Sequence, residues 1–331
     1  MLDLLINYGL FLARTLTIVV AVIFVVASIA SILVRGKSEK RENLQIKSLN
    51  EKYRRFARSL EFETLSKHNF KQIAKKEKND RKAEKKSEKK ADFIKKRVFV
   101  LDFNGDIKAS AVDLLREEIT ALLTVVKPRD EVLLRLESAG GMVHSYGLAA
   151  SQLLRLRNKS VSLTIAVDKV AASGGYMMAC VADRIIAAPF AIIGSIGVVA
   201  QIPNINRLLK QHNIDYEQIT AGKYKRTLTF MGENTDEERD KVRQELEETH
   251  DLFKDFVVQR RQELDIEKVA TGEYWYGSRA LELKLVDELM TSDDYLMMAA
   301  DESDLFEVNY EVKRSLMQKL PFAVQGLFNR G

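Results

Sequence analysis

Strand-like and helix-like patterns alternate along the chain from residue 98 onward. Four short apolar runs are typical of buried strands: residues 98–103, 131–136, 162–168 and 184–187. Longer segments with apolar residues at helical spacing lie between them, at 112–126, 143–157 and 176–182. Because strands and helices follow each other in turn, the pattern predicts an α/β fold with a largely parallel sheet.

Further elements are predicted past residue 190. Residues 192–199 are apolar and punctuated by glycine, and the later elements are a helix at 205–212, a strand at 216–220, a long helix after Thr235 and a helix at 278–289. Thr235 and Glu238 form a capping-box sequence, which marks the start of the long helix. We therefore assign the folded domain to residues 98–300 and a C-terminal tail to residues 301–331.

The N-terminus carries a long apolar run. Residues 15–34 have no charged side chain. Twenty helical residues span about 30 Å, which is the thickness of the hydrocarbon core of a bilayer. The alternative, a cleaved signal peptide, is disfavoured because the run is too long and no basic segment precedes it. We expect residues 1–34 to be a retained anchor that contacts membrane lipid through residues 10–34.

Residues 35–97 form a basic linker that is partly helical or disordered. They hold 23 Lys and Arg against 10 Asp and Glu, a net +13, whereas the whole chain is +5. Since residues 1–34 are neutral, residues 98–331 carry −8, and nucleic acid is not an expected partner of the folded part. A helical stripe within the linker predicts an amphipathic helix on the membrane surface or against a partner; its members are Leu49, Tyr53, Phe56 and Leu60.

A serine at a strand-to-helix turn is the main candidate for chemistry. Ser173 follows the strand at 162–168 and precedes Gly174 and Gly175. The first backbone N–H groups of a helix are unpaired and its N-terminus is positive. An oxyanion is stabilised there, and a serine there acts as a nucleophile when a base is near. The alternative is a tight turn whose small residues let a helix pack closely on a sheet.

Histidine is the first type of base to consider. His144 is the strongest candidate because it follows the loop at Gly140 and Gly141, although a histidine at a helix start is often simply exposed. The other histidines lie in polar contexts where solvated side chains are expected: His68, His212 and His250.

Lysine is the second type of base. A lysine kept neutral by burial or by a cationic neighbour can take a proton from serine. Lys223 and Lys225 lie in one loop and share a face of an extended chain, so spacing does not choose between them. The alternative is that both are solvated surface residues.

Cofactor chemistry is not expected. Cys180 is the single cysteine, so the chain has no internal disulfide and no cysteine-based zinc site, and we interpret it as a small buried residue. The sequence contains no G-x-x-x-x-G-K-[ST] motif, so no nucleotide-binding P-loop is present. We expect neither a metal nor a cofactor.

Five motifs together resemble the signal peptide peptidase A family, in its short form with an N-terminal anchor. They occur in the family's order and rough spacing over about residues 95–300: Ser138–Gly141, Ala171–Tyr176, Gly194–Val198, Ala221–Lys225 and Ala280–Glu288. The resemblance implies a crotonase/ClpP-like fold and a serine peptidase with a Ser/Lys dyad. Ser173 matches the family's nucleophile and Lys225, 52 residues later, matches its general base.

The resemblance also implies an oxyanion hole and an assembly. Backbone N–H groups of Gly140 or Gly141 and of Gly174 match the oxyanion hole, and a ring-like homo-oligomer is expected. Two positions depart from the family's pattern, namely Ala139 where proline is usual and Lys284 where glycine is common. Neither departure touches the dyad.

The leading interpretation is a membrane-anchored endopeptidase that cuts short or unfolded apolar peptides, such as remnants of signal peptides, without ATP. The alternatives are a crotonase-type acyl-CoA enzyme and a non-enzymatic anchored scaffold. Location in the bacterial inner membrane follows from the resemblance. The basic flank after the anchor predicts a cytosolic catalytic domain, whereas the resemblance predicts a periplasmic one, which we favour because the long downstream segment weakens the charge rule.

Overall fold

The computed structural model describes residues 2–36, 42–88 and 95–312. The chain forms two compact units, one of residues 1–44 with 310–331 and one of residues 45–309. Each unit is described by itself.

The first unit contains the helix α1, Leu2–Gly36. Its segment Tyr8–Val25 has a mean hydropathy of 2.2 and none of it is buried. This is the one helix within the described residues that is long and apolar enough to cross a membrane. The predicted span at residues 15–34 also falls inside α1, so the expected helix is present.

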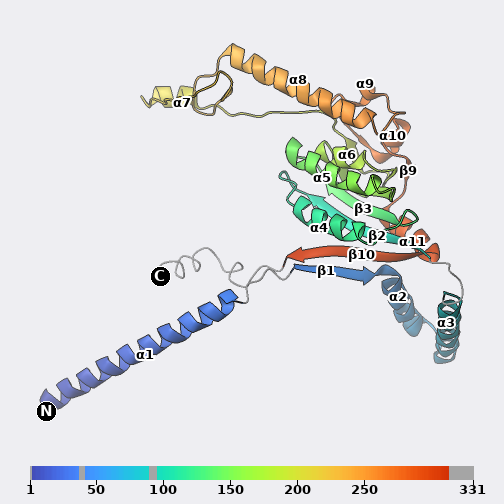
Figure 1. Ribbon diagram of the computed structural model, residues 1–331, viewed down its shortest axis with the longest axis horizontal. Helices are drawn as coiled ribbons and strands as arrows, with labels where there is room; N and C mark the ends of the chain where they lie inside the picture. The colour runs from blue at the N-terminus through green and yellow to red at the C-terminus, as the bar shows by residue number, and fades with distance from the viewer. Residues whose placement is uncertain (1, 37–41, 89–94, 313–331) are drawn as a thin grey trace. The chain divides into compact units, whose positions relative to one another are not determined.

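A ten-stranded sheet organises the second unit (Figure 1). Its main path runs β1 (Glu42–Ser48), β10 (Ser303–Val312), β2 (Lys96–Gly105), β3 (Glu131–Ser138), β4 (Ser162–Val167), β6 (Arg184–Ala187) and β9 (Glu288–Leu289). A branch beside β3 holds β5 (Val170–Ala172), β7 (Ile192–Gly194) and β8 (Tyr274–Tyr276). The pairings from β10 through β9 and from β3 through β7 are parallel, and the β7–β8 pairing is antiparallel. The predicted mixed α/β fold with a largely parallel sheet is confirmed.

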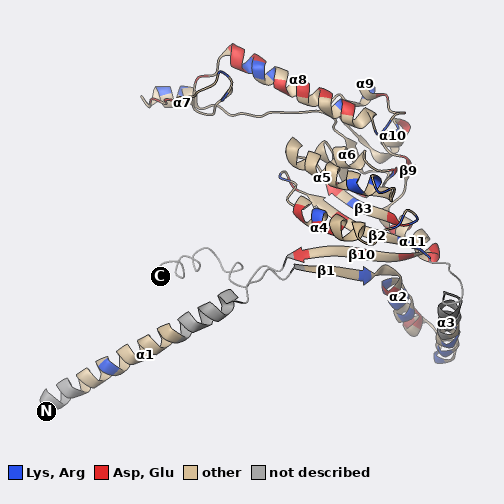
Figure 2. Ribbon diagram, in the orientation of Figure 1, with Lys and Arg blue, Asp and Glu red and all other residues tan. Residues whose placement is uncertain are grey.

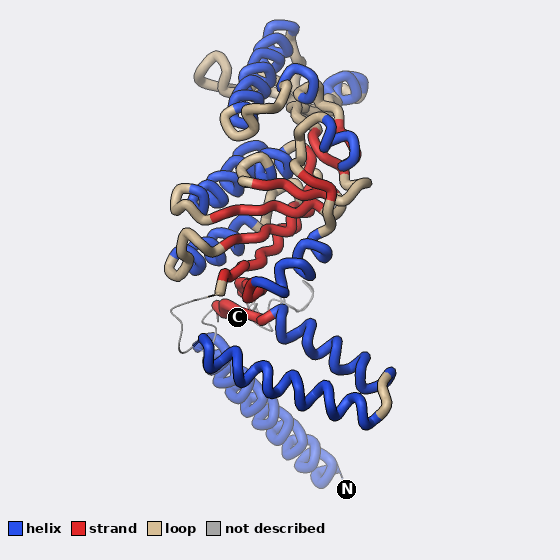
Figure 3. Tube along the Cα trace, turned by 90° about the vertical axis from the view of Figure 1, so that its right-hand side faces the viewer, coloured by secondary structure: helices blue, strands red, loops and turns tan. Residues whose placement is uncertain are grey.

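Three helices and a large apolar core cover one face of the sheet, as Figure 3 shows from the side. They are α4 (Val112–Leu123), α5 (Val143–Arg157) and α6 (Gly174–Ala179). Each of these helices turns its apolar positions toward the strands, and residues such as Leu115, Tyr146 and Leu153 are fully buried. This burial is the main force that holds the layer in place.

A smaller apolar cluster lies on the opposite face, under α2 (Leu49–Thr64) and α11 (Ser292–Glu302). Leu49 at the start of α2 is buried in it and Tyr53 packs against it. Buried Asn50 joins the two ends of the unit, because its Nδ2 donates to the carbonyls of Ala300 (3.1 Å) and Ser303 (3.0 Å) and its Oδ1 accepts from the N–H of Leu305 (2.7 Å).

The remaining helices lie outside these two layers. They are α3 (Lys67–Glu88), α7 (Asn206–Gln211), α8 (Asp236–Val258), α9 (Ile266–Val269) and α10 (Gly277–Glu282). The capping box predicted from Thr235 and Glu238 is present at the start of α8. Phe253 and Val257 bury one side of the C-terminal half of α8 in the main core.

The structure differs from the sequence-based expectations in several places. The strand expected at 216–220 is wrong, because these residues are exposed, have no regular secondary structure and pair with no strand. Residues 303–312 lie in the expected tail yet form β10, which pairs with β2; residues 313–331 lie outside the described residues. Within the expected linker the strand β1 was not expected, whereas α2 and α3 lie where partly helical structure was expected, and α2 contains the predicted amphipathic stripe.

The helix expected at 278–289 is also shorter, and Lys284 explains why. Lys284 has φ of 61°, a left-handed conformation in which a helix ends. Its N–H donates to the carbonyl of Leu281 (3.0 Å), and the N–H of Leu285 donates to that of Ala280 (2.9 Å), which is the Schellman pattern. The glycine common in the family at this position fits that backbone without steric cost.

Lys284→Gly is therefore expected to raise the free energy of unfolding by about 0.5–1 kcal/mol, because a non-glycine residue in the left-handed region is strained by about 1–2 kcal/mol. The variant also loses the ion pair between Lys284 and Glu263. Lys284→Ala is the matched control, since it loses the ion pair and keeps the strain. Urea unfolding of the three proteins measures the difference, and equal stability of the glycine and alanine variants would contradict the explanation.

Candidate active site

The candidate site lies where three neighbouring parallel strands end. Ser138 of β3 pairs with Ala171 of β5, and Ala172 of β5 pairs with Gly194 of β7. Loops that follow the carboxyl ends of parallel strands gather at one edge of a sheet. The sequence motifs around Gly140, Ser173 and Ser195 therefore meet at one place, although they are spread over more than fifty residues of chain.

Ser173 occupies a strained turn between β5 and α6. Its φ is 51° and its ψ is −118°, a conformation that residues other than glycine rarely adopt. The backbone N–H of Ser173 donates to the carbonyl of Gly194 (2.8 Å), which holds the turn against β7. Its side chain makes no capping hydrogen bond to α6 and is half-buried. Strain of this kind is typical of functional sites, where the surrounding structure fixes one side chain in place.

The glycine loop after β3 touches this turn directly. A Cβ placed on Gly140 would lie 2.7 Å from the backbone N of Gly174 and 2.8 Å from the Cβ of Ser173, and Gly140 has φ of 91°. Only glycine satisfies both the conformation and the close approach. The N–H of Gly140 already donates to Ser138 Oγ (3.0 Å), so Gly141 and Gly174 are the better candidates for oxyanion donors.

Tyr146 contacts both segments that form the site. The sequence analysis did not identify it. It lies in α5 and is fully buried, and its ring would be 2.4 Å from a Cβ at Gly174. Its hydroxyl lies 2.6 Å from Ser138 Oγ and donates to the carbonyl of Asp106 (2.7 Å). The ring thus holds the start of α6 while the hydroxyl holds the glycine loop. Its sequence context, a tyrosine on an apolar helix face, carries no signal beyond burial.

Ser173 opens onto a cleft of about 720 Å³. The apolar part of its lining comprises Ile107, Val198, Val199 and Leu246. Its volume falls within the range of ligand-binding sites, about 300–1,000 Å³. One wall of the cleft is α8, which contributes Arg243, Leu246, Glu247 and His250.

The histidines are placed differently from the sequence-based expectation. His250, which was expected to be solvated, is half-buried and lines the cleft that contains Ser173, and its Nε2 is buried with no hydrogen-bond partner among the described residues. His144 is exposed and does not line the cleft. The helical face that α8 turns toward the site depends on tertiary packing, which explains why the sequence pattern missed His250.

The lysine loop is not part of this cleft. Among the described residues that line it, none lies between Val199 and Arg243. Lys225 is exposed in the loop between α7 and α8, where its N–H donates to the carbonyl of Gly222 (3.1 Å). In Figure 1 the helix α7, just before this loop, lies at the N-terminal end of α8, away from α5 and α6. The structure therefore does not bring Lys225 to Ser173 within one chain.

Lys223 differs from Lys225 in its partners. Its ammonium group forms an ion pair with Glu237 (2.8 Å). Hydrogen bonding to Glu237 is the main cause that raises the pKa of Lys223 above its ordinary value. A raised pKa stabilises the protonated form, which is the wrong form for a base.

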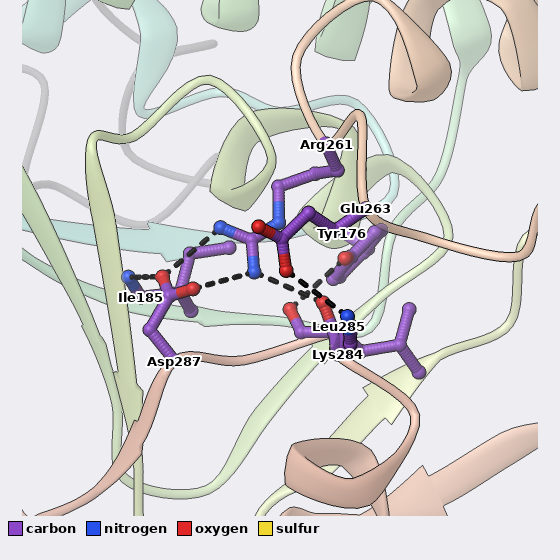
Figure 4. A network of polar contacts seen from close by, with 7 residues as sticks. All are labelled: Tyr176, Ile185, Arg261, Glu263, Lys284, Leu285 and Asp287. Atoms are coloured by element: carbon purple, nitrogen blue, oxygen red, sulfur yellow. Dashed lines mark hydrogen bonds and ion pairs between the residues drawn. The ribbon is translucent and has the colours of Figure 1, made fainter.

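A polar network holds α6 through Tyr176 (Figure 4). The Arg261 guanidinium donates two hydrogen bonds to the Asp287 carboxylate (2.7 and 3.0 Å) and one to the carbonyl of Lys284 (2.9 Å). Asp287 also accepts from the N–H of Ile185 (2.7 Å), and Tyr176 of α6 donates to the carbonyl of Leu285 (2.9 Å). The segment around residue 286 thereby ties α6 to β6.

Cys180 directly follows α6, beside this network. It is fully buried, and burial raises the pKa of its thiol to about 12. A thiol with a raised pKa is a poor nucleophile, which agrees with the interpretation of Cys180 as a structural residue.

Arg261→Ala is expected to lower the free energy of unfolding by about 2–3 kcal/mol, because it leaves a partly buried carboxylate without its cation. That loss corresponds to a fall in Tm of about 4–12 °C for a domain of this size. Arg279→Ala is the matched control, since Arg279 forms an exposed ion pair with Glu282 in α10, and such pairs contribute little. Thermal unfolding followed by circular dichroism measures both variants. Equal Tm values for the two variants would show that the network does not stabilise the fold.

Within residues 2–36, 42–88 and 95–312, no group of three or more His, Cys, Asp or Glu side chains is placed to hold a metal ion.

Comparison with known families and proteins gives matches over most of the chain. Residues 3–153 match the family model described as Peptidase family S49 N-terminal, and residues 155–305 match that of Peptidase family S49. A relative from Haemophilus influenzae called Probable protease SohB is 53% identical over 325 residues, which cover 96% of this chain and 92% of the relative. A relative of the same name from Buchnera aphidicola subsp. Schlechtendalia chinensis is 49% identical over 306 residues, covering 89% of this chain and 99% of the relative.

Proposed function

The chain belongs to peptidase family S49, and from this premise we propose that it is a membrane-anchored serine endopeptidase with Ser173 as nucleophile and Lys225 as general base. The observation that carries the proposal is the strained turn at Ser173, which faces a cleft of about 720 Å³. The turn also contacts the Gly140 loop, which supports an oxyanion hole formed by backbone N–H groups of the turn and the loop. A crotonase/ClpP-like fold is the architecture we propose for the second unit.

In the proposed reaction the Ser173 hydroxyl oxygen attacks the carbonyl carbon of the scissile peptide bond, and the neutral amine of Lys225 takes the hydroxyl proton. The N–H groups of Gly141 and Gly174 donate to the oxygen that becomes negative. Lys225 then gives the proton to the leaving amine as the C–N bond breaks. A water molecule releases the acyl group by the same steps, with Lys225 again as base.

The base is proposed to come from a neighbouring copy of the chain. Lysine is protonated in water at neutral pH and becomes a base only when it is desolvated or placed near another cation. Lys225 is exposed in the single chain, so its desolvation requires a partner surface. The segment that carries it also exposes large apolar side chains, and Ile219 is 94% exposed. Exposed apolar groups of this kind mark interaction surfaces, which supports a homo-oligomer.

The substrates are proposed to be short or unfolded apolar peptides, such as signal-peptide remnants, cut without ATP. The apolar lining of the cleft by Ile107, Val198 and Val199 supports this class. A crotonase-type acyl-CoA enzyme would not need Ser173, and a scaffold would need no nucleophile at all.

A serine-reactive fluorophosphonate probe separates these functions. The full chain in detergent is expected to be labelled at Ser173, as mass spectrometry of the labelled peptide would show. The hydroxyl of Ser151, which lies on the surface of α5, is the internal control for unspecific reaction. Absence of label at Ser173 in protein that cleaves a peptide library would remove Ser173 as nucleophile.

We also propose that α1 anchors the chain in the inner membrane and that the catalytic domain faces the periplasm. The expected result is that a reporter enzyme which is active only in the periplasm works when fused after Gly331. The lysine and arginine residues after α1 predict the opposite side. Activity of a reporter that works only in the cytosol would therefore show that the charge rule, rather than the family resemblance, gives the orientation.

A further inference from the structure

We infer that α2 and α3 form a contact surface for anionic phospholipid. This contact sets the orientation of the catalytic domain at the membrane. The inference rests on the proposed insertion of α1 and does not depend on the catalytic residues. We call the segment Leu49–Glu88 the basic hairpin, because α2 and α3 follow each other across a two-residue connection. Phe62 of α2 and Phe70 of α3 pack edge to face with ring centroids 5.4 Å apart, which joins the two helices.

The base of the basic hairpin is held firmly by the catalytic domain. Leu49 is buried in the smaller apolar cluster and Tyr53 packs against it. The three hydrogen bonds of Asn50 to α11 and β10 fix the first turn of α2. The Ser48 side chain caps the helix by accepting from the N–H of Glu51 (3.3 Å). Because α2 is joined rigidly to the sheet, binding of the outer part of α2 to a surface also sets the orientation of the sheet on that surface.

The apolar face of α2 continues beyond the part that the domain covers. Phe56 and Leu60 lie on the same helical face as Leu49 and Tyr53, since their spacings are four, three and four residues. Yet Phe56 is 57% exposed and Leu60 is 67% exposed. The described residues therefore leave more than half of each of these two side chains uncovered.

Basic side chains flank this uncovered face. The Lys52 ammonium lies 5.8 Å from the centroid of the Phe56 ring, and Arg55 and Arg58 are exposed further along α2. Figure 2 shows blue basic positions along α2. By sequence α3 adds nine Lys and Arg against four Asp and Glu. An exposed apolar face with basic flanks is the composition that binds at the boundary between headgroups and acyl chains.

The chain that connects α1 to this surface is short. Twelve residues separate the last residue of α1 from the first of α2, and a fully extended connection of that length spans about 45 Å. Residues 98–331 carry a net −8 and are repelled by an anionic surface, whereas the basic hairpin is attracted. These observations favour anionic lipid as the occupant over a soluble partner.

The test uses the full chain in liposomes of phosphatidylethanolamine and phosphatidylglycerol. Leu60→Cys carries a bimane label, and Leu252→Cys on α8, which is similarly exposed, is the matched control. Cys180 is buried and is expected to stay unlabelled. We expect brominated lipid to quench the label at residue 60 at least about twofold more than the label at residue 252, because an interfacial helix inserts its apolar face among the acyl chains.

Two further measurements test the role of charge. Phosphatidylcholine liposomes, and the triple variant Lys52→Gln, Arg55→Gln, Arg58→Gln, should each remove most of the quenching at residue 60. Flotation of the liposomes shows separately whether α1 has inserted. Inserted protein whose residue 60 is not quenched would overturn the inference. A label at residue 60 that becomes buried in detergent in a concentration-dependent way would assign the surface to a second copy of the chain instead.

Discussion

Replacing Ser173 with alanine is expected to lower kcat/KM for peptide cleavage by about 10⁴- to 10⁶-fold, which is the scale of losing a covalent nucleophile. The change removes one oxygen from a half-buried side chain that makes no capping hydrogen bond. Alanine meets the same backbone strain as serine at φ of 51°, so the turn and the fold are expected to remain. The measurement is initial rates on a peptide library with the full chain in detergent.

Ser151→Ala is the control for removing a serine hydroxyl, because Ser151 lies on α5 and donates only to the carbonyl of Gly147 (2.8 Å). Its activity should equal that of the unchanged protein. Circular dichroism of the Ser173 variant should show native helix content. Turnover by Ser173→Ala within a factor of ten of the unchanged protein would exclude a covalent mechanism through this residue.

Lys225→Ala is expected to be as inactive as Ser173→Ala, whereas Lys223→Ala should keep most of the activity. Both lysines lie in an exposed loop, but Lys223 forms an ion pair with Glu237. Because Glu237 favours the protonated form of Lys223, this lysine is a poor base. With lysine as base, the rate of the unchanged protein should rise with pH, since the base must be neutral. His250→Gln is the needed control, as His250 lines the same cleft as Ser173. An active Lys225→Ala protein together with an inactive His250→Gln protein would move the role of base to His250.

Mixing the two inactive variants tests the proposed assembly. If one copy supplies Lys225 to Ser173 of the next, then mixed oligomers of Ser173→Ala and Lys225→Ala contain some interfaces with both groups intact. Part of the activity should return on mixing in detergent followed by reassembly. No recovery, with oligomers present in sedimentation, would contradict a site shared between two copies of the chain.

Local patterns predicted the parts of the fold that depend on local structure. The strands at 98–103 and 131–136 and the helix at 143–157 are present because apolar spacing and burial agree there. The turn at Ser173 was also found, since strand, small residues and glycines adjoin in sequence. The motifs that meet at the site were identified by resemblance, and their convergence follows from the parallel pairing of β3, β5 and β7.

Features that depend on distant contacts could not be predicted. The sequence did not predict β10 as a strand, because its partner β2 lies about two hundred residues earlier in the chain. The segment at 216–220 has strand-like composition but no neighbouring strand to pair with. The sequence shows His250 as a polar residue on a charged helix, and only the orientation of α8 reveals that it lines the cleft. Lys225 is a different case, because its proposed partner surface belongs to another molecule.

Asn50 has a consequence for the order of events during synthesis. Its side chain needs Ala300, Ser303 and Leu305, about 250 residues further along the chain. A growing polypeptide therefore completes the smaller apolar cluster and the β10–β2 pairing only when translation is almost finished. Until then the edge of β2 is open and the first turn of α2 is unfixed. A nascent chain is thus kept from this arrangement until β10 emerges from the ribosome.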